Sequence, residues 1–263
     1  MSETEQSSLL RFASLIAAAL LFNGCGGSSP TGPSATPAPV FQQHTSEHFI
    51  LQFTSIDAAS VAATASTVEA EYARIVADLQ PPPMSRVTVF LYPDFASMQN
   101  AVRGAVGTLP AFARGLVTGA ANIHVLSPGL ASVWPYTDGV RAIVHEFAHC
   151  VSLQLNSTIA NNPRWLWETV AIFEAGEFVD PRSVSWMSNG QLPAMARLNG
   201  FDNTDIYAAG YVLGEFIVSR WGREGLIGLI RANGNTAAVM GMNESEFLQA
   251  WYDFVRARYL ASS

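Results

Sequence analysis

The strongest constraint on the fold is that strand patterns and helix patterns occupy different parts of the chain. "HFILQF" at 48–53 and "RVTVFLY" at 86–92 are apolar and rich in β-branched and aromatic residues, which predicts strands. The segment 57–79 between them has helical periodicity, and from Asp138 onward the patterns are helical. A small sheet followed by helices is typical of an α+β domain rather than of alternating parallel units.

Shorter sequence patterns predict further helices and strands. "DFASMQNAVRG" at 94–104 predicts a short helix, and Asn122–Leu126 predicts a strand. The glycines of the stretch before that strand indicate a backbone that bends or that another group approaches closely. Asn162 is expected to cap a helix whose first residue is Pro163. The other helices are expected at about 137–155, 204–220, 223–233 and 243–259.

The composition bounds the kinds of partner that the chain can bind. Apolar residues make up 49% of the 263 residues, which is enough for a large core, and only 13% are charged. All 14 basic residues are arginine, and the net charge is -7 with no basic cluster. Because nucleic-acid binding needs a basic surface, we predict no nucleic-acid partner and favour small or peptidic ones.

The N-terminal part has the pattern of an export signal. Arg11 precedes an apolar run, 12–22, that is too short to span a bilayer but suits the core of a secretion signal. The following Gly24 and Cys25 resemble the lipobox of bacterial lipoproteins, in which the cysteine is lipidated and holds the protein at a membrane. We therefore predict a signal peptide over 1–25, a flexible tether over 26–46 and a folded domain over 47–263.

The predicted location is the cell envelope, as a lipoprotein exported and anchored through Cys25. Phe22 and Asn23 are unusual before such a cysteine, so a periplasmic or secreted protein with ordinary signal cleavage is the first alternative, and an uncleaved anchor or a misplaced start is the second. If Cys25 is acylated, Cys150 has no disulfide partner, and we expect it to be a small buried residue.

The stretch "RAIVHEFAHC" at 141–150 contains the main candidate for chemistry. On a helix, His145 and His149 lie one turn apart on the same face, so both imidazoles can point at one ion. Glu146 lies about 100° round the helix, on the flank of that point. Two neutral nitrogen ligands with a carboxylate beside them suit zinc. We predict His145 and His149 as metal ligands and Glu146 as the general base towards water.

A catalytic zinc site needs a third protein ligand. The extended metzincin pattern requires glycine at 152 and histidine at 155, but the chain has Ser152 and Leu155, which excludes it. Glu168 follows His149 after eighteen intervening residues, within "RWLWETVAIFE". Here the sequence resembles the gluzincin metallopeptidases, whose pattern is HExxH, eighteen residues and a glutamate within a segment like "WLxEGxAxY". Peptidase MA-like proteins of bacteria are similar over about 47–259.

The specific part of the resemblance is HExxH with Glu168, and the flanking residues match the family pattern at some positions and depart from it at others. The matching residues are Trp165, Leu166, Glu168, Ala171 and, in the aromatic position, Phe173. Thr169 replaces a glycine, and Ile172 stands where thermolysin-like enzymes have an aspartate, so the group that orients the zinc histidines is left open. The resemblance implies a zincin-like fold, one Zn²⁺ per chain on His145, His149 and Glu168, and hydrolysis of peptide bonds in a peptide or protein substrate.

The resemblance also implies residues that contact the substrate. Gluzincins commonly stabilise the oxyanion with a tyrosine or histidine; Tyr207 matches the tyrosine that often opens the later helix, Tyr211 lies one turn beyond it, and Tyr136 is a weaker candidate. Each could instead be a core aromatic. The strand before the active helix is commonly an edge that pairs with an extended substrate. Asn122 and His124 are therefore expected to contact substrate, through the backbone more than through the imidazole.

The remaining candidates are expected to be structural. On a continued helix, Glu174 and Glu177 lie about 240° and 180° from Glu168, so we expect both to be solvated or structural. His44 and His48 are expected at the surface, and the tryptophans at 165, 167, 221 and 251 in the core. The alternative to a peptidase is a catalytically inactive zincin-like protein with a binding or structural role as a lipoprotein.

Overall fold

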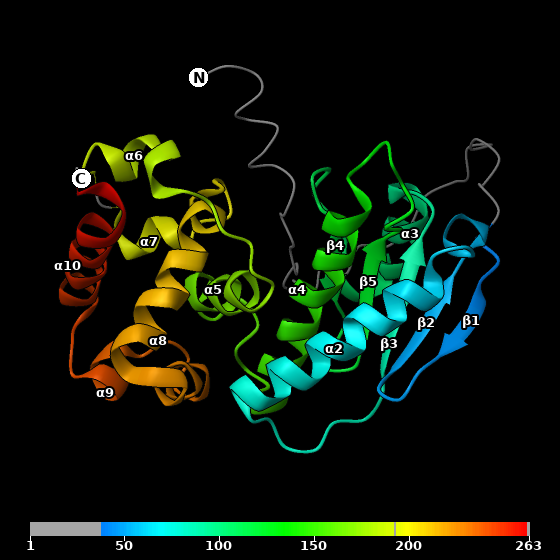
Figure 1. Cartoon of the computed structure of the whole chain (residues 1–263), viewed down its shortest axis with the longest axis horizontal. Coiled ribbons are helices and arrows are strands. Elements are labelled where there is room, and N and C mark those ends of the chain that lie inside the picture. Colours follow the sequence, from blue (N-terminus) through cyan, green and yellow to red (C-terminus); the bar gives the residue numbers. More distant parts are fainter. Residues whose placement is uncertain (1–37, 192, 262–263) are drawn as a thin grey trace, which may run out of the picture.

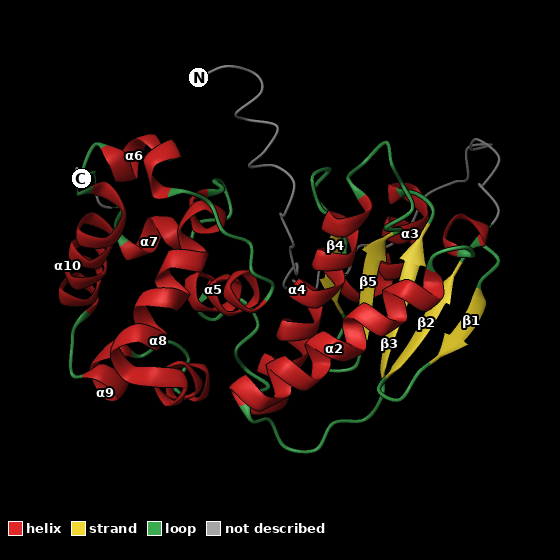
Figure 2. Cartoon of the chain, viewed as in Figure 1, coloured by secondary structure: helices red, strands yellow, loops and turns green. Residues whose placement is uncertain are grey.

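A small mixed sheet and a helical half make up the part of the chain that the computed structural model describes, residues 38–191 and 193–261. The predicted signal peptide, Cys25 and residues 26–37 of the predicted tether lie outside these residues. Figure 1 and Figure 2 show the sheet beside a group of helices formed by the second half of the chain. This arrangement confirms the predicted α+β class.

The sheet has the strand order β1-β2-β3-β5-β4. Its three central strands are parallel, and the two outer strands run antiparallel to their neighbours. The bounds are β1 (Gln42–Thr45), β2 (Phe49–Phe53), β3 (Val87–Tyr92), β4 (Gly115–Val117) and β5 (Asn122–Leu126). The first strand begins before residue 47 because His44 and its neighbours pair with β2. The C-terminal boundary of the predicted tether is therefore wrong.

Alternation along the strands separates two faces of the sheet. Phe49 packs against Tyr72 of α2 (Val61–Leu79) and Phe147 of α4 (Tyr136–Leu155), so its face is the one that these helices cover. Figure 1 shows both helices in front of the sheet and α3 (Phe95–Val106) behind its upper end. Phe90 and His124 pair with each other on the opposite face. The strand registers place Leu51, Val87, Val89, Ile123 and Val125 on the face of Phe49.

The helical half is built around α5 (Arg164–Glu174), which packs between α4 and α8 (Asp205–Arg231). Gly222, with a φ of 67°, interrupts α8 where the sequence predicts the boundary between two helices. As predicted, Cys150 is buried, as are the tryptophans at 165, 167 and 251. Trp221 is only partly buried, although it packs against the core. The remaining elements are η2 (Ser55–Asp57), η3 (Pro181–Ser183), α6 (Ser185–Ser188), α7 (Met195–Leu198), α9 (Thr236–Met240), α10 (Glu244–Val255) and η4 (Arg256–Leu260).

The N-terminus of α5 differs from the prediction. Pro163 precedes the first helical residue, and the amide of Asn162 donates to the carbonyl of Thr158 instead of capping the helix. The backbone N–H of Trp165, which has no acceptor within the helix, donates to the side-chain oxygen of Asn199 at 3.0 Å. The first turn of α5 is thus satisfied by a residue that is distant in sequence.

The start of α2 also differs from the prediction. The helix begins at Val61 rather than at 57, and Asp57 ends the short turn η2. The buried carboxylate of Asp57 accepts hydrogen bonds from Ser127 Oγ at 2.7 Å and from the N–H of Gly129 at 3.1 Å. Asp57 therefore ties the start of α2 to the segment that leads into α4.

Candidate metal centre

The packing of α5 on α4 brings the three predicted ligands together. His145 and His149 lie one turn apart on α4, and Glu168 lies in the middle of α5. One ligand atom from each of the three residues lies within 4.8 Å of the other two. All three side chains are buried, with at most 1% exposed. The two helices thus form a site of the size that one metal ion needs.

The donor atoms of this site have no other hydrogen-bond partner among the residues that the structure describes. They are Nε2 of His145, both ring nitrogens of His149 and both carboxylate oxygens of Glu168. A buried polar atom without a partner costs about 1–3 kcal/mol, so such atoms are rare and rarely cluster. A cation would satisfy one nitrogen of each imidazole and the carboxylate, and two imidazoles with one carboxylate are a donor set of catalytic zinc sites. The residues therefore fit a metal ion.

The two histidines have different surroundings. Burial alone would lower the pKa of His145, but the neighbouring carboxylates, first Glu177 through its charge and then Glu168 and Glu146, outweigh it and hold the pKa well above its usual value. Burial lowers the pKa of His149 well below its usual value, and the charge of His145 adds to this effect. The ring of His149 stacks on Trp167 with the centroids 3.9 Å apart. Carboxylates thus surround His145, whereas His149 packs against the ring of a tryptophan.

Glu177 is the site residue that sequence reasoning missed. Both of its carboxylate oxygens lie 3.1 Å from Nδ1 of His145. The side chain is only 3% exposed, so of the two expected surroundings, solvated or structural, the solvated one is wrong. Burial raises the pKa of Glu177, although the charge of His145 opposes this shift. Because Nδ1–H is bound in this way, Nε2 of His145 is the atom left for a metal. Glu177 thus supplies the orienting group that Ile172 cannot.

The turn after α5 explains why helical geometry placed Glu177 wrongly. The helix ends at Glu174, and Gly176 has a φ of 68° in the left-handed region. The N–H of Glu177 donates to the carbonyl of Ile172 at 3.0 Å, and the N–H of Gly176 donates to Phe173 at 3.1 Å. These two bonds form a Schellman motif, which reverses the chain. The glycine at 176 is a helix-stop signal, and applying it would have shown that Glu177 lies outside the helix.

Glu146 lies on the flank of the metal group, against β4. A Cβ atom on Gly115 would lie only 2.6 Å from Oε1 of Glu146, so a side chain there would displace the carboxylate. Of the two alternatives that the glycines of this stretch suggest, a bend or a close approach, the close approach is the one found at Gly115. β4 is an outer strand of the sheet, and the residues that flank it, Arg114 and Thr118, bond to β5: the carbonyl of Arg114 accepts from the N–H of Leu126, and the N–H of Thr118 donates to the carbonyl of Asn122. By alternation, the N–H and C=O groups of Gly115 and Val117 point away from β5.

The structure corrects the placement of Asn122 and His124. The strand β5 lies between β3 and β4 and is not an edge, because the short strand β4 takes that position. His124 is on the face opposite α4, where its ring nitrogens lie 2.9 Å from the hydroxyls of Tyr92 and Thr118. Asn122 shares that face, and its amide donates to the carbonyl of Thr118. Both side chains therefore point away from the metal group.

The three candidate tyrosines lie in different surroundings. Tyr207 is 4% exposed, and burial raises its pKa, followed by the charges of Glu168 and Glu146, which places its hydroxyl in the electrostatic field of the site. The ring of Tyr211 packs instead on two phenylalanines, at 173 and 178. Tyr136 is 37% exposed and lies 2.7 Å from the hydroxyl of Thr64. Of the three tyrosines, Tyr207 is the one whose pKa is raised by the carboxylates of the metal group and its flank.

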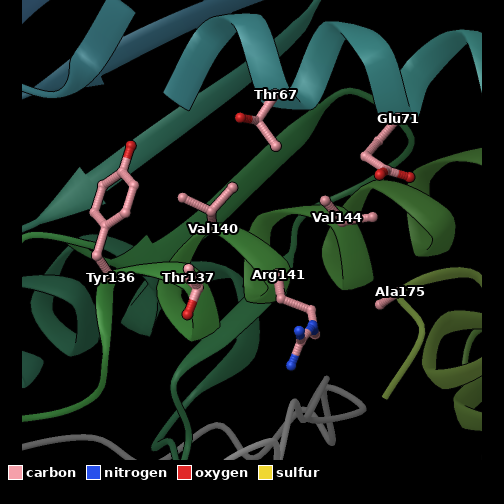
Figure 3. Close-up of a pocket in the computed structure, with 8 residues that line it drawn as sticks. All are labelled: Thr67, Glu71, Tyr136, Thr137, Val140, Arg141, Val144 and Ala175. Atoms are coloured by element: carbon pink, nitrogen blue, oxygen red, sulfur yellow. The ribbon is translucent and has the colours of Figure 1, made fainter. Parts of the chain in front are cut away.

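A groove of about 240 Å³ runs between α2 and the first half of α4. Figure 3 shows Val140 and Val144 on its floor and Thr67 pointing towards them from α2, while Arg141 points away from α2. Ala175, the residue that follows α5, closes one end. The groove therefore ends beside the turn that carries Glu177. Its full lining is Thr67, Glu71, Tyr136, Thr137, Val140, Arg141, Val144 and Ala175.

Comparison with known families agrees with this geometry. A family model described as the Peptidase MA superfamily matches residues 67–257. The chain belongs to the Peptidase MA superfamily. The matched region begins within α2 and ends within η4, so the whole metal group of this superfamily member lies inside it. No curated protein and no solved structure matches the chain. Over residues 38–191 and 193–261, the helices lack the combination of length and apolar character that a membrane span requires.

Proposed function

We propose that this member of the Peptidase MA superfamily is a zinc-dependent peptidase of the gluzincin type. The observation that carries the proposal is the buried convergence of His145, His149 and Glu168, whose donor atoms lack other partners, beside the carboxylate of Glu146. Structural zinc sites are closed by four protein ligands, whereas catalytic sites have three and keep one position open. A three-ligand set next to a carboxylate favours hydrolysis over a structural role.

The chain's own residues divide the work of peptide hydrolysis. A bound zinc ion would lower the pKa of a water molecule and polarise the scissile carbonyl. Glu146 accepts a proton from the attacking water and gives it to the amine that leaves when the C–N bond breaks. Tyr207 donates its hydroxyl hydrogen to the oxygen on which negative charge develops; because burial raises its pKa, the hydroxyl stays protonated.

The substrate that we propose is an extended peptide or unfolded protein segment that lies along β4. The backbone groups of Gly115 and Val117 point away from β5, and main-chain pairing with such an edge is a common mode of peptide recognition. Gly115 also lies against Glu146. A peptide on this edge would therefore pass the general base. Recognition through the backbone accepts many side chains, and pockets beside the edge supply preference.

We also propose that the protein is exported and held at the cell envelope by a lipid on Cys25. The support is the apolar run at 12–22 followed by Gly24 and Cys25. Expression of the full chain and of Cys25→Ser, followed by separation of membranes from soluble protein, tests this part. The wild type should sediment with membranes and the variant should not. Equal distribution of both proteins would contradict a lipid anchor.

Metal analysis and a peptide-library digest of the purified protein test the enzymatic proposal. We expect one zinc per chain and cleavage of library peptides. Glu146→Gln should retain zinc and the fold but lose about 10²- to 10⁴-fold in kcat/KM, because it removes only the proton transfer. Glu224→Gln makes the same chemical change at an exposed position of α8 and should behave as wild type.

The outcomes separate the possible roles. Zinc in the protein without hydrolysis of any peptide would indicate the inactive binding protein instead of the enzyme. Hydrolysis that persists in Glu146→Gln would contradict the assigned general base. Absence of stoichiometric zinc from both the wild type and Glu146→Gln would refute the metal site itself.

A further inference from the structure

The segment that ends α5 holds two buried carboxylates with different partners. Glu177 accepts from Nδ1 of His145 on α4. Glu174, three residues earlier, is bound by Arg74 of α2 and by Arg223 of α8. Their side chains are 3% and 0% exposed, respectively. The segment 174–177 therefore connects the metal centre with two helices whose arginines lie outside it.

Arg74, Glu174 and Arg223 form what we call the Glu174 clamp. Nη1 of Arg223 donates to Oε1 of Glu174 at 2.7 Å, and Nη1 of Arg74 donates to Oε2 at 2.8 Å. Nη2 of Arg74 also donates to the backbone carbonyl of Glu174. Asp78 joins the two arginines, accepting from Arg223 at 2.6 Å and from Arg74 at 3.2 Å. Both the carboxylate and the main chain at residue 174 are thus held in place.

The charges of the clamp suit a positioning role better than a stabilising one. Burial raises the pKa of Glu174, while Arg223 and Arg74 lower it. A buried ion pair loses hydration that its mutual attraction barely offsets, so it adds little stability compared with apolar packing. Removing one partner leaves an unpaired buried charge. Compared with apolar packing such a network adds little stability, but it fixes where its members lie, and removal of one member costs stability.

The position of Glu177 needs to be fixed from outside the helix. Ile172 is apolar and packs on α8, where a Cβ atom on Gly210 would lie 2.6 Å from its Cδ1. The orienting carboxylate comes from beyond the end of α5, after the left-handed Gly176. The backbone bond from Glu177 to Ile172 ties the turn to the last helical residues, and the clamp holds those residues to α2 and α8.

We propose that the Glu174 clamp positions the metal centre: by fixing the end of α5, it sets the carboxylate of Glu177 against Nδ1 of His145 and so directs Nε2 of His145 to the metal. The inference rests on the proposed zinc site. The clamp arginines come from helices on either side of α5, and Figure 1 shows the C-terminal end of α2 reaching towards the lower part of α8. Zinc affinity should therefore depend on a contact between the two halves of the molecule.

The test measures zinc affinity of the purified full chain by competition with a chromophoric chelator. Glu177→Gln should weaken zinc binding about 10- to 100-fold, as for other residues that orient metal ligands. Arg223→Gln should weaken it about 10-fold, at the lower end of the same range. Arg223→Lys keeps the charge but loses the fork that reaches both Glu174 and Asp78, so its affinity should be intermediate.

A double variant separates positioning from general stability. If the clamp acts through Glu177, Arg223→Gln combined with Glu177→Gln should bind zinc as tightly as Glu177→Gln alone. Arg256→Gln, which breaks the exposed pair with Asp253 at 3.1 Å, makes the same change elsewhere and should leave zinc affinity unchanged. The melting temperature of each metal-free variant shows whether the fold has changed.

Two results would overturn the inference. One is a double variant whose zinc affinity falls by the product of the two single-variant factors, because the two residues would then act independently. The other is a lowered melting temperature of the metal-free Arg223 variants with unchanged zinc affinity. If Arg223→Gln does not fold, Arg223→Lys and Arg74→Lys carry the test, and wild-type zinc affinity in both would overturn it. If the wild-type protein binds no zinc, the proposed function is overturned together with the clamp. If the wild type binds zinc and the clamp variants bind it equally tightly, only the positioning role of the clamp is overturned.

Discussion

Replacing Gly115 by alanine tests whether the backbone of β4 positions the proposed general base. The added Cβ atom would lie 2.6 Å from Oε1 of Glu146, with the Cγ and Cδ atoms of that side chain at 3.1 and 3.2 Å. Gly115 has no left-handed φ, so alanine introduces no backbone strain. The substitution therefore acts on the Glu146 carboxylate without changing a metal ligand.

The size of the effect follows from this overlap. Ordinary contact begins at 3.4 Å, so Oε1 must move by about 0.8 Å, the difference from 2.6 Å. The free energy of unfolding should fall only modestly, because all three atoms that must give way belong to one side chain and none to the backbone. A reacting group misplaced by about 1 Å can lose about 10²-fold in rate. We therefore expect Gly115→Ala to lower kcat/KM by about 10- to 100-fold.

The assay is peptide hydrolysis with zinc content measured on the same preparations. Gly104→Ala is the matched control, because a Cβ atom there meets nothing within 4 Å. Gly115→Ala should contain as much zinc as wild type. Wild-type kcat/KM in the zinc-loaded variant would refute the reasoning, since it would mean that the Glu146 carboxylate is not held against β4 during catalysis.

Three further predictions concern other parts of the molecule. Glu168→Gln should remove zinc from the purified protein and abolish the rise in melting temperature that zinc gives wild type; retained zinc would contradict its assignment. Tyr207→Phe should lower kcat about 10²- to 10³-fold at unchanged zinc content, and Tyr211→Phe should not. Burial lowers the pKa of His124 from 6.5 to about 4, so the unfolded chain binds a proton that the folded protein excludes. Stability should thus fall as the pH drops from 6.5 to 4, by at most about 3 kcal/mol from this group. Urea unfolding of His124→Gln should show a correspondingly smaller fall, and an unchanged pH dependence would refute this origin.

The parts of the molecule that the sequence predicts well are those with long, regular periodicity. The i and i+4 spacing of His145 and His149 needs only a helix, and α4 is twenty residues long. The family pattern places Glu168 on the next helix, and the packing of α5 on α4 brings it within reach. Such patterns can be predicted because the helical periodicity depends on residues that are close together in the sequence.

The edge of the sheet could not be predicted in the same way. The strand β4 spans only Gly115–Val117, which is too short to show an alternating pattern. Its place outside β5 depends on a chain reversal between the two strands, not on their composition. For that reason Asn122 and His124 were predicted at the site, although the register places both side chains on the opposite face.

Two departures arise because distant residues or the end of a helix decide the local structure. Asn199 accepts from the N–H of Trp165, so the first turn of α5 does not need the cap predicted at Asn162. Glu177 was placed by extending helical geometry past Gly176, where the helix has already stopped. In the first case the deciding contact is with a residue distant in sequence, which a local pattern cannot show. In the second case the deciding signal, the helix-stopping glycine, is present in the sequence.

The two nitrogens of His145 define how long α5 can be. Glu168 approaches Nε2 at 3.5 Å from the middle of α5, and Glu177 approaches Nδ1 at 3.1 Å from the turn beyond its end. One residue more or less between them would rotate the turn by about 100° and shift it by about 1.5 Å. Glu168 and Glu177 could then no longer bracket the same imidazole. The helix stop at Gly176 is therefore as much a part of the metal centre as the histidine spacing on α4.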